Sequence, residues 1–182
     1  MKKINFILLG LAGLLLCSCS SLNSYSFDSQ ALDSRSRWAL LPIVNNTDTP
    51  QAGLSAESLL EHVLLSRGIT NLTRYPVSLS RDSLFEPTER KVSEEAQKWA
   101  RDQGLRYAVT GSVEEWRYKI GIDGEPAVGV TLKVLDLSNG RVLWSATGAK
   151  SGWSREALAS VAQSLIVKLM STLNLTSPGS NG

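Results

Sequence analysis

Cysteine and histidine are nearly absent from this sequence of 182 residues. Its two cysteines, Cys17 and Cys19, both lie close to the N-terminus, so the rest of the chain can form no disulfide and has no thiol nucleophile. The only histidine, His62, lies beside Glu61 in a predicted helix. A histidine-rich metal site or a Ser-His catalytic pair therefore has a single candidate, and we expect this histidine to be structural or solvated.

The sequence motifs of common enzyme classes are also missing. There is no glycine-rich phosphate-binding loop, no HExxH, no pair of CxxC motifs and no GxSxG. The adjacent Glu114 and Glu115 fall in a predicted strand, where neighbouring side chains point to opposite faces, so they cannot act as a side-by-side acid pair. We therefore predict a domain that is not an enzyme and that needs no metal and no cofactor.

The N-terminus carries a signal sequence. Lys2 and Lys3 precede an apolar segment, 7–16, that is too short to cross a bilayer as a helix. It ends in the sequence LCSC, which is typical of a bacterial lipoprotein signal: leucine at −3, a small residue at −1 and then the cysteine that receives the lipid. An ordinary secretory signal with incidental cysteines is the alternative.

The lipidated cysteine can be chosen by the residue before it. Cleavage before Cys19 places the small Ser18 at −1, whereas cleavage before Cys17 places the bulky Leu16 there. We therefore predict residues 1–18 as the signal peptide and Cys19 as the residue that carries a covalent N-acyl diglyceride. Because the next residue is Ser20 and not aspartate, the usual sorting rule predicts the periplasmic face of the outer membrane.

Removing the signal changes the charge of the chain. Of the 182 residues 164 remain, and the loss of two lysines leaves 17 basic residues against 17 acidic ones, so the formal charge falls from +2 to zero. A nucleic-acid partner thus has no electrostatic basis. The length suits one domain with a sizeable core.

We predict three parts in the mature chain. Residues 19–36 are the lipidated cysteine and a flexible, serine-rich tether, in which Tyr25 and Phe27 could alternatively dock on a neighbouring subunit. Residues 37–173 form the folded domain, and residues 174–182 form a disordered tail.

The hydrophobic pattern of the domain predicts a single mixed-sheet α/β sandwich in the order β-α-β-α-β-β-β-α. Strands are expected at 37–44, 69–75, 105–119, 128–135 and 142–149, and helices at 55–66, 93–104 and 154–173. Ser55 is the predicted N-cap of the first helix, Gly68 its terminating glycine, and Asn139-Gly140 a type I′ hairpin turn. The last helix has a clean apolar stripe that we expect to pack on the sheet.

Two local features allow more than one interpretation. Asp123 precedes a glycine in the loop IGIDGEP, which is ordinary turn chemistry. Trp153 precedes Ser154; if that serine caps the last helix, the tryptophan would form a hydrophobic staple with Leu158. Tryptophan is also enriched where one side of a protein meets a membrane. Of the other tryptophans, we expect Trp38, Trp116 and Trp144 in the core or at a subunit interface.

Two stretches of sequence carry a family resemblance. They are WALLPIVNNTDTP and GSVEEWRYKIGIDGEPAVG, the second continuing to Glu156. Together with the lipoprotein signal and the order of elements, they resemble the PelC family, the outer-membrane lipoproteins of the Pel exopolysaccharide export system. The resemblance extends over about residues 37–173 and is densest over 111–156.

The resemblance implies a function. It implies a periplasmic ring of about a dozen identical subunits beneath the outer membrane, placed around the mouth of a PelB-like β-barrel porin. It also implies an acidic funnel, with Asp123 as a contributor, that guides a cationic exopolysaccharide during biofilm formation. Trp153 would then belong to an aromatic belt that touches the inner leaflet of the outer membrane.

Two other functions are the alternatives. A CsgG-like secretion component would need long lipid-facing hairpins, and the sequence shows no such pair of alternating segments. An LpoB-like regulator of a periplasmic synthase would need a longer linker to cross the peptidoglycan layer. Both are therefore disfavoured.

Overall fold

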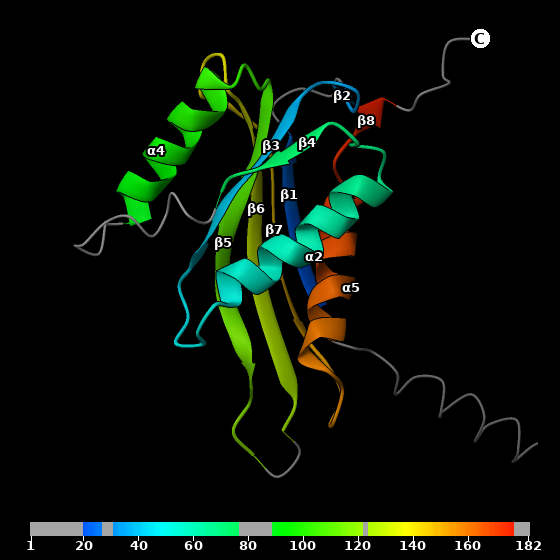
Figure 1. The fold of residues 1–182 in the computed structure, drawn as a ribbon. Coiled ribbons are helices and arrows are strands. Elements are labelled where there is room, and N and C mark those ends of the chain that lie inside the picture. Colours follow the sequence, from blue (N-terminus) through cyan, green and yellow to red (C-terminus); the bar gives the residue numbers. More distant parts are fainter. Residues whose placement is uncertain (1–19, 27–30, 77–88, 122–123, 177–182) are drawn as a thin grey trace, which may run out of the picture.

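The computed structural model describes residues 20–26, 31–76, 89–121 and 124–176. One sheet of six strands has the order β1-β7-β6-β5-β3-β4 (Figure 1). Its strands are β1 (Ser20–Ser26), β3 (Trp38–Asn45), β4 (Leu72–Arg74), β5 (Tyr107–Tyr118), β6 (Pro126–Asp136) and β7 (Val142–Ser151). Strand β3 runs parallel to β4 and β5, and the remaining pairs are antiparallel. The predicted mixed α/β sandwich is confirmed.

In the described part of the chain, three helices cover the sheet. Helices α2 (Ala52–Ser66) and α5 (Leu158–Met170) pack side by side on one face, and α4 (Glu89–Asp102) lies against β3 on the other (Figure 1). The main core lies beneath α2 and α5, and Trp38, Trp116 and Trp144 are all buried in it. The predicted apolar stripe of α5 faces this core as expected. No helix in the described part of the chain is long and apolar enough to span a membrane.

The predicted tether is wrong over much of its length. Residues Ser20–Ser26 form β1, which pairs antiparallel with β7 along the edge of the sheet. An edge strand is held by backbone hydrogen bonds and needs little apolar pattern; here only Leu22 packs against the core. Phe27 lies outside the described residues. The serine-rich composition therefore concealed a strand.

The predicted tail is wrong at its start for a similar reason. A two-residue strand, β8 (Leu175–Thr176), pairs in parallel with β2 (Leu32–Asp33). The buried hydroxyl of Ser34 donates a hydrogen bond to the carbonyl of Thr176 at 2.9 Å. Strands β2 and β8, which show no apolar periodicity, are thus joined although they lie near opposite ends of the sequence.

Several predicted boundaries also move. Helix α2 begins at Ala52, so Ser55 lies inside its first turn and is not its N-cap, whereas Gly68 ends it with a φ of +87° as predicted. Helix α4 begins at Glu89 instead of residue 93. In the β6–β7 loop only Gly140 has a positive φ (+73°), so this longer loop is not the type I′ turn, which needs two such residues.

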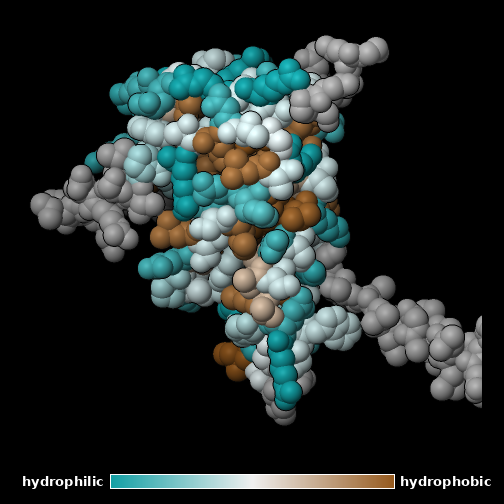
Figure 2. Space-filling view, turned by 45° about the vertical axis from the view of Figure 1, so that its right-hand side comes forward, coloured by the Kyte–Doolittle hydropathy of each residue, from teal (hydrophilic) through white to brown (hydrophobic). Residues whose placement is uncertain are grey.

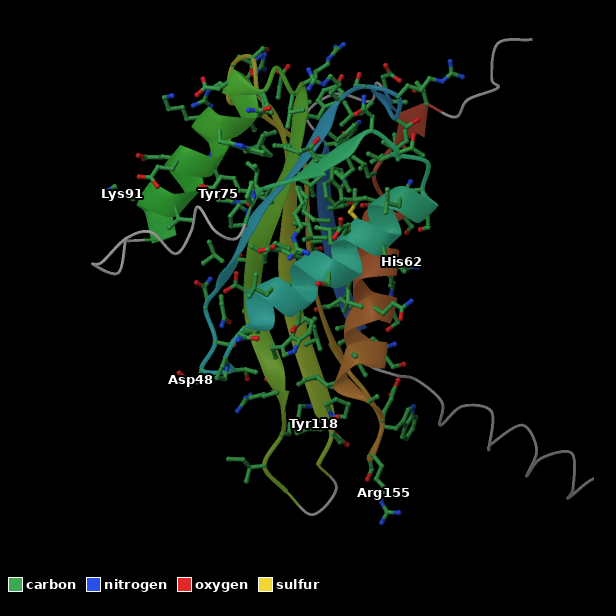
Figure 3. The ribbon with its side chains drawn as sticks, in the orientation of Figure 1. Asp48, His62, Tyr75, Lys91, Tyr118 and Arg155 are labelled. Carbon is green, nitrogen blue, oxygen red and sulfur yellow. The ribbon has the colours of Figure 1, made fainter. Side chains whose placement is uncertain are left out.

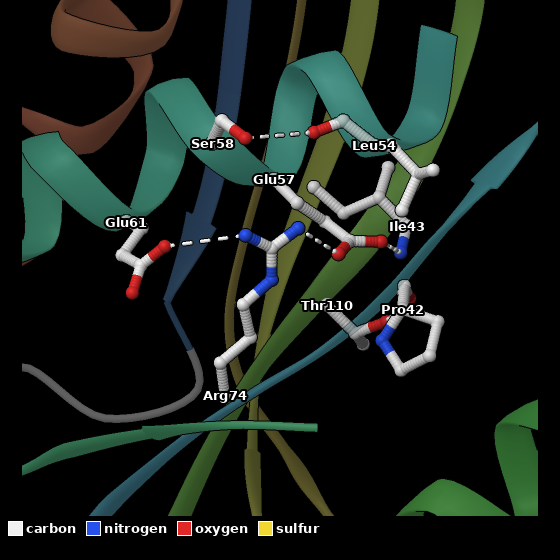
Figure 4. A network of polar contacts seen from close by, with 8 residues as sticks. All are labelled: Pro42, Ile43, Leu54, Glu57, Ser58, Glu61, Arg74 and Thr110. Atoms are coloured by element: carbon white, nitrogen blue, oxygen red, sulfur yellow. Dashed lines mark hydrogen bonds and ion pairs between the residues drawn. The ribbon is translucent and has the colours of Figure 1, made fainter. Parts of the chain in front are cut away.

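Proline interrupts β3 and is compensated by a buried acid. Pro42 has no N–H, and the pairing of β3 with β5 shifts register around it. The next N–H, that of Ile43, donates to Glu57 Oε1 of α2 at 3.0 Å. The other oxygen of Glu57 accepts a hydrogen bond from Arg74 at 2.8 Å, and Arg74 also pairs with the more exposed Glu61 (Figure 4). This network joins α2 to β3 and to the edge strand β4.

Candidate functional site

One end of the sheet gathers the features that the sequence singled out. Tyr118 at the end of β5 pairs with the first residue of β6, and Ser151 at the end of β7 pairs with Ala127 of β6. Ser20, the first residue of β1, pairs with Lys150 at the same end. Figure 3 labels Tyr118 at this end, together with Arg155 in the loop that follows β7. We call this the Trp153 end, because Trp153 lies in that loop.

The turn around Trp153 is closed by Glu156. The Glu156 carboxylate accepts a hydrogen bond from the Trp153 N–H at 3.0 Å, and the Glu156 N–H donates to the Trp153 carbonyl at 3.0 Å. Between them Arg155 adopts a left-handed conformation with a φ of +67°. The Trp153 side chain is 59% exposed. The turn therefore presents the indole to the outside of the subunit.

Of the two interpretations of Trp153, the hydrophobic staple is excluded. Helix α5 begins at Leu158 with Ala157 as N-cap, so Ser154 is no cap and Trp153 lies outside the first helical turn. The N–H of Leu158 donates instead to the hydroxyl of Tyr118 at 3.1 Å, and that hydroxyl donates to the Glu156 carbonyl at 3.3 Å. The hydroxyl of Tyr118, which is distant in sequence, thus accepts a hydrogen bond from the helix N-terminus in place of an N-cap side chain.

The hairpin between β5 and β6 projects from the same end. Its base is closed by the Lys119 N–H, which donates to the Glu125 carbonyl at 2.7 Å, and by an ion pair of the two side chains at 3.6 Å. Ile120 is fully exposed, a feature that our sequence analysis did not single out although it is an apolar residue in a polar loop. Asp123 lies outside the described residues, as does the predicted lipid site Cys19.

The acids beside this hairpin have separate partners. Glu114 accepts hydrogen bonds from Ser112 and Asn46, which lower the pKa of its carboxyl, the serine having the larger effect. Glu115 instead pairs with Arg117 at 3.0 Å. Their side chains do not form an acid pair.

The remaining titratable candidates do not assemble either. His62 is exposed on α2. Among the described residues, no three or more His, Cys, Asp or Glu side chains come close enough to hold a metal ion. The features that distinguish the Trp153 end are thus its exposed apolar side chains and its loops.

The fold and sequence have clear relatives among solved structures. No family model and no curated protein sequence matches the chain. The PelC dodecamer from Paraburkholderia phytofirmans is 42% identical, with a TM-score of 0.73; the match covers 87% of this chain and 100% of that one. A lipoprotein from Neisseria meningitidis shares the fold, with a TM-score of 0.57 at 14% identity, over 75% of this chain and 96% of that one. From its identity and coverage with the first of these relatives, the chain belongs to the PelC family.

Proposed function

We propose that this protein is a non-enzymatic outer-membrane lipoprotein that assembles into a ring and guides a cationic exopolysaccharide to a β-barrel porin for export. The observation that carries the proposal is the 42% identity to a PelC dodecamer over the whole length of that chain. In this proposal the partners are further copies of the chain, a PelB-like barrel, the polymer and the inner leaflet of the outer membrane.

The geometry of the Trp153 end supports the membrane part of this proposal. Cys19 directly precedes Ser20, the first residue of β1, so a lipid on Cys19 would emerge at this end. The two most exposed large apolar side chains of the described chain, Ile120 and Trp153, project there as well. Apolar and aromatic side chains beside an acyl anchor add to its binding energy at the interface. No flexible linker remains between lipid and sheet, which further disfavours an LpoB-like regulator.

We expect the fluorescence of Trp153 to shift to the blue when protein without the lipid is mixed with phosphatidylethanolamine–phosphatidylglycerol vesicles. Of the five tryptophans, Trp38, Trp116 and Trp144 are at most 6% exposed, and Trp99 packs on Tyr75. The response to lipid should therefore come mainly from Trp153, and the variant Trp153→Ala should lose most of it. A wild-type spectrum that lipid leaves unchanged would overturn the membrane contact.

A second prediction concerns the acidic funnel. Replacing Asp123 by asparagine keeps the turn chemistry and removes one negative charge per subunit, and a ring repeats that loss around its axis. We expect Asp123→Asn to leave the fold and the ring intact. Secreted polymer should fall about twofold or more, because the variant weakens the negative field that steers a cationic polymer. The measurement is secreted polymer in cells that carry only the variant.

Glu125 provides the matched control for this experiment. Its carboxylate already pairs with Lys119, so Glu125→Gln removes a charge that is locally compensated. Secretion should fall less than in Asp123→Asn. Equal secretion by wild type and Asp123→Asn would count against a guiding role for Asp123.

A further inference from the structure

The outward faces of α2 and α5 are unusually poor in charge. Helix α5 has one charged residue, Lys168, among 13, and α2 has two among 15, Glu57 and Glu61, which both pair with Arg74. Helix α4, in contrast, carries eight charged residues among 14. A helix whose outward face lacks charge is usually covered by something, and interface centres are depleted of charged side chains.

Apart from Lys168 and the half-exposed Glu61, the exposed side chains of α2 and α5 carry no carboxylate, ammonium or guanidinium group. Leu65 of α2 is 45% exposed and Val167 of α5 is 48% exposed, with Ser58, His62 and Gln163 exposed on the same two helices. Figure 2, which brings this side forward, shows brown apolar side chains at several places across the middle of the molecule, while teal ones gather at its top. We call this surface the helix layer.

The opposite face of the sheet is partly uncovered. Helix α4 lies over β3, and none of the described helices lies over this side of β1 and β7. The side chains there are mostly small: Thr147 and Ala149 are exposed on β7, and Thr147 hydrogen-bonds Thr131 of β6 at 2.9 Å. Tyr25 of β1 pairs with Ser145 in the same row and is 57% exposed. We call this surface the open sheet face.

We infer that the helix layer of one copy packs on the open sheet face of the next copy. The two surfaces lie on opposite sides of one sheet, so each copy can contact two neighbours through different patches. Such a head-to-tail contact closes into a ring when its rotation allows. A second copy is the occupant because the relative that matches this chain at 42% identity is a dodecamer. Tyr25 supplies the aromatic side chain that interface centres favour. The inference rests on the ring proposed above.

The experiment places one charge on each surface in the full-length lipoprotein, purified in detergent, and measures mass by native mass spectrometry. Val167→Asp alters the helix layer and Thr147→Asp alters the open sheet face; both side chains are exposed, so folding should survive, as circular dichroism would show. Each variant should weaken the contact by about tenfold or more and yield mainly monomers. Because each variant keeps one intact surface, their mixture should form dimers and nothing larger.

The control variant is Lys91→Asp on α4, which introduces the same acid on an exposed helical position outside both surfaces. It should assemble like the wild type. If the wild type is a ring and Val167→Asp or Thr147→Asp still forms it, the assigned surfaces are wrong while the proposed ring stands. If the wild type is a monomer, the ring and the inference fall together. Vesicle binding is measured on the same variants. If Val167→Asp still forms the ring but no longer binds vesicles, the helix layer is a lipid-binding surface and the inference is overturned.

Discussion

Replacing Glu57 by alanine is expected to destabilise the protein by about 2–3 kcal/mol. Glu57 is only 6% exposed, and its carboxylate accepts hydrogen bonds from the Ile43 N–H and from Arg74. The variant would leave a buried N–H without its acceptor and a guanidinium without its main counter-charge. The Arg74 side chain is 28% exposed, so water relieves part of the cost, and the effect stays below that of a fully buried pair. Urea unfolding at a fixed protein concentration measures it.

Glu61 offers a matched control on the same helix. It binds the same arginine at 3.3 Å, but its side chain is 37% exposed, and within the described residues no backbone N–H donates to its carboxylate. Glu61→Ala should therefore cost less than about 1 kcal/mol. Similar losses of stability in Glu57→Ala and Glu61→Ala would show that the ion pairs with Arg74 stabilise the fold and that the hydrogen bond from the Ile43 N–H does not.

We also expect a large loss of stability when Gly111 is replaced by alanine. A Cβ atom at Gly111 would lie 2.0 Å from the carbonyl oxygen of Thr131 and 3.1 Å from the Cα of Leu132. Both neighbours are backbone atoms of β6 at the centre of the sheet, so neither can turn away. We expect a loss of about 2–3 kcal/mol in the free energy of unfolding, or a fall in Tm of about 4–12 °C, which differential scanning calorimetry would measure.

The control for this variant is Gly121→Ala in the β5–β6 hairpin. No heavy atom lies within 4 Å of a Cβ placed there, and its φ is not in the left-handed region. Its Tm should stay within about 2 °C of the wild type, because surface substitutions away from contacts change stability little. An unchanged Tm for Gly111→Ala would mean that β5 and β6 can separate without cost.

The sequence predicted those elements in which buried and exposed side chains follow a regular period. The alternation of Val128, Val130, Leu132 and Val134 placed β6 correctly, because each of these side chains enters the core. The stripe along α5 succeeded for the same reason. Where burial follows a period, the period is visible in the sequence.

Elements that depend on distant partners could not be predicted in this way. Strand β1 pairs through its backbone, which leaves almost no trace in its side chains. The start of α5 is set by the hydroxyl of Tyr118, forty positions from the N–H of Leu158 that it binds. At the candidate site, the sequence identified Trp153, which is exposed, but it missed Ile120, which is exposed at the same end of the sheet.

The pairing of β1 with β7 also has a mechanical consequence. The ladder extends from Ser20 opposite Lys150 to Ser26 opposite Trp144, and its first residue adjoins Cys19. If Cys19 carries the proposed lipid, a force on that lipid along the axis of β1 would load the ladder in shear and spread over all of its hydrogen bonds together. A force across the strand would instead open them one after another. To pull such an anchor from the domain, β1 would have to slide past β7, so the edge of the sheet would serve as a tensile joint.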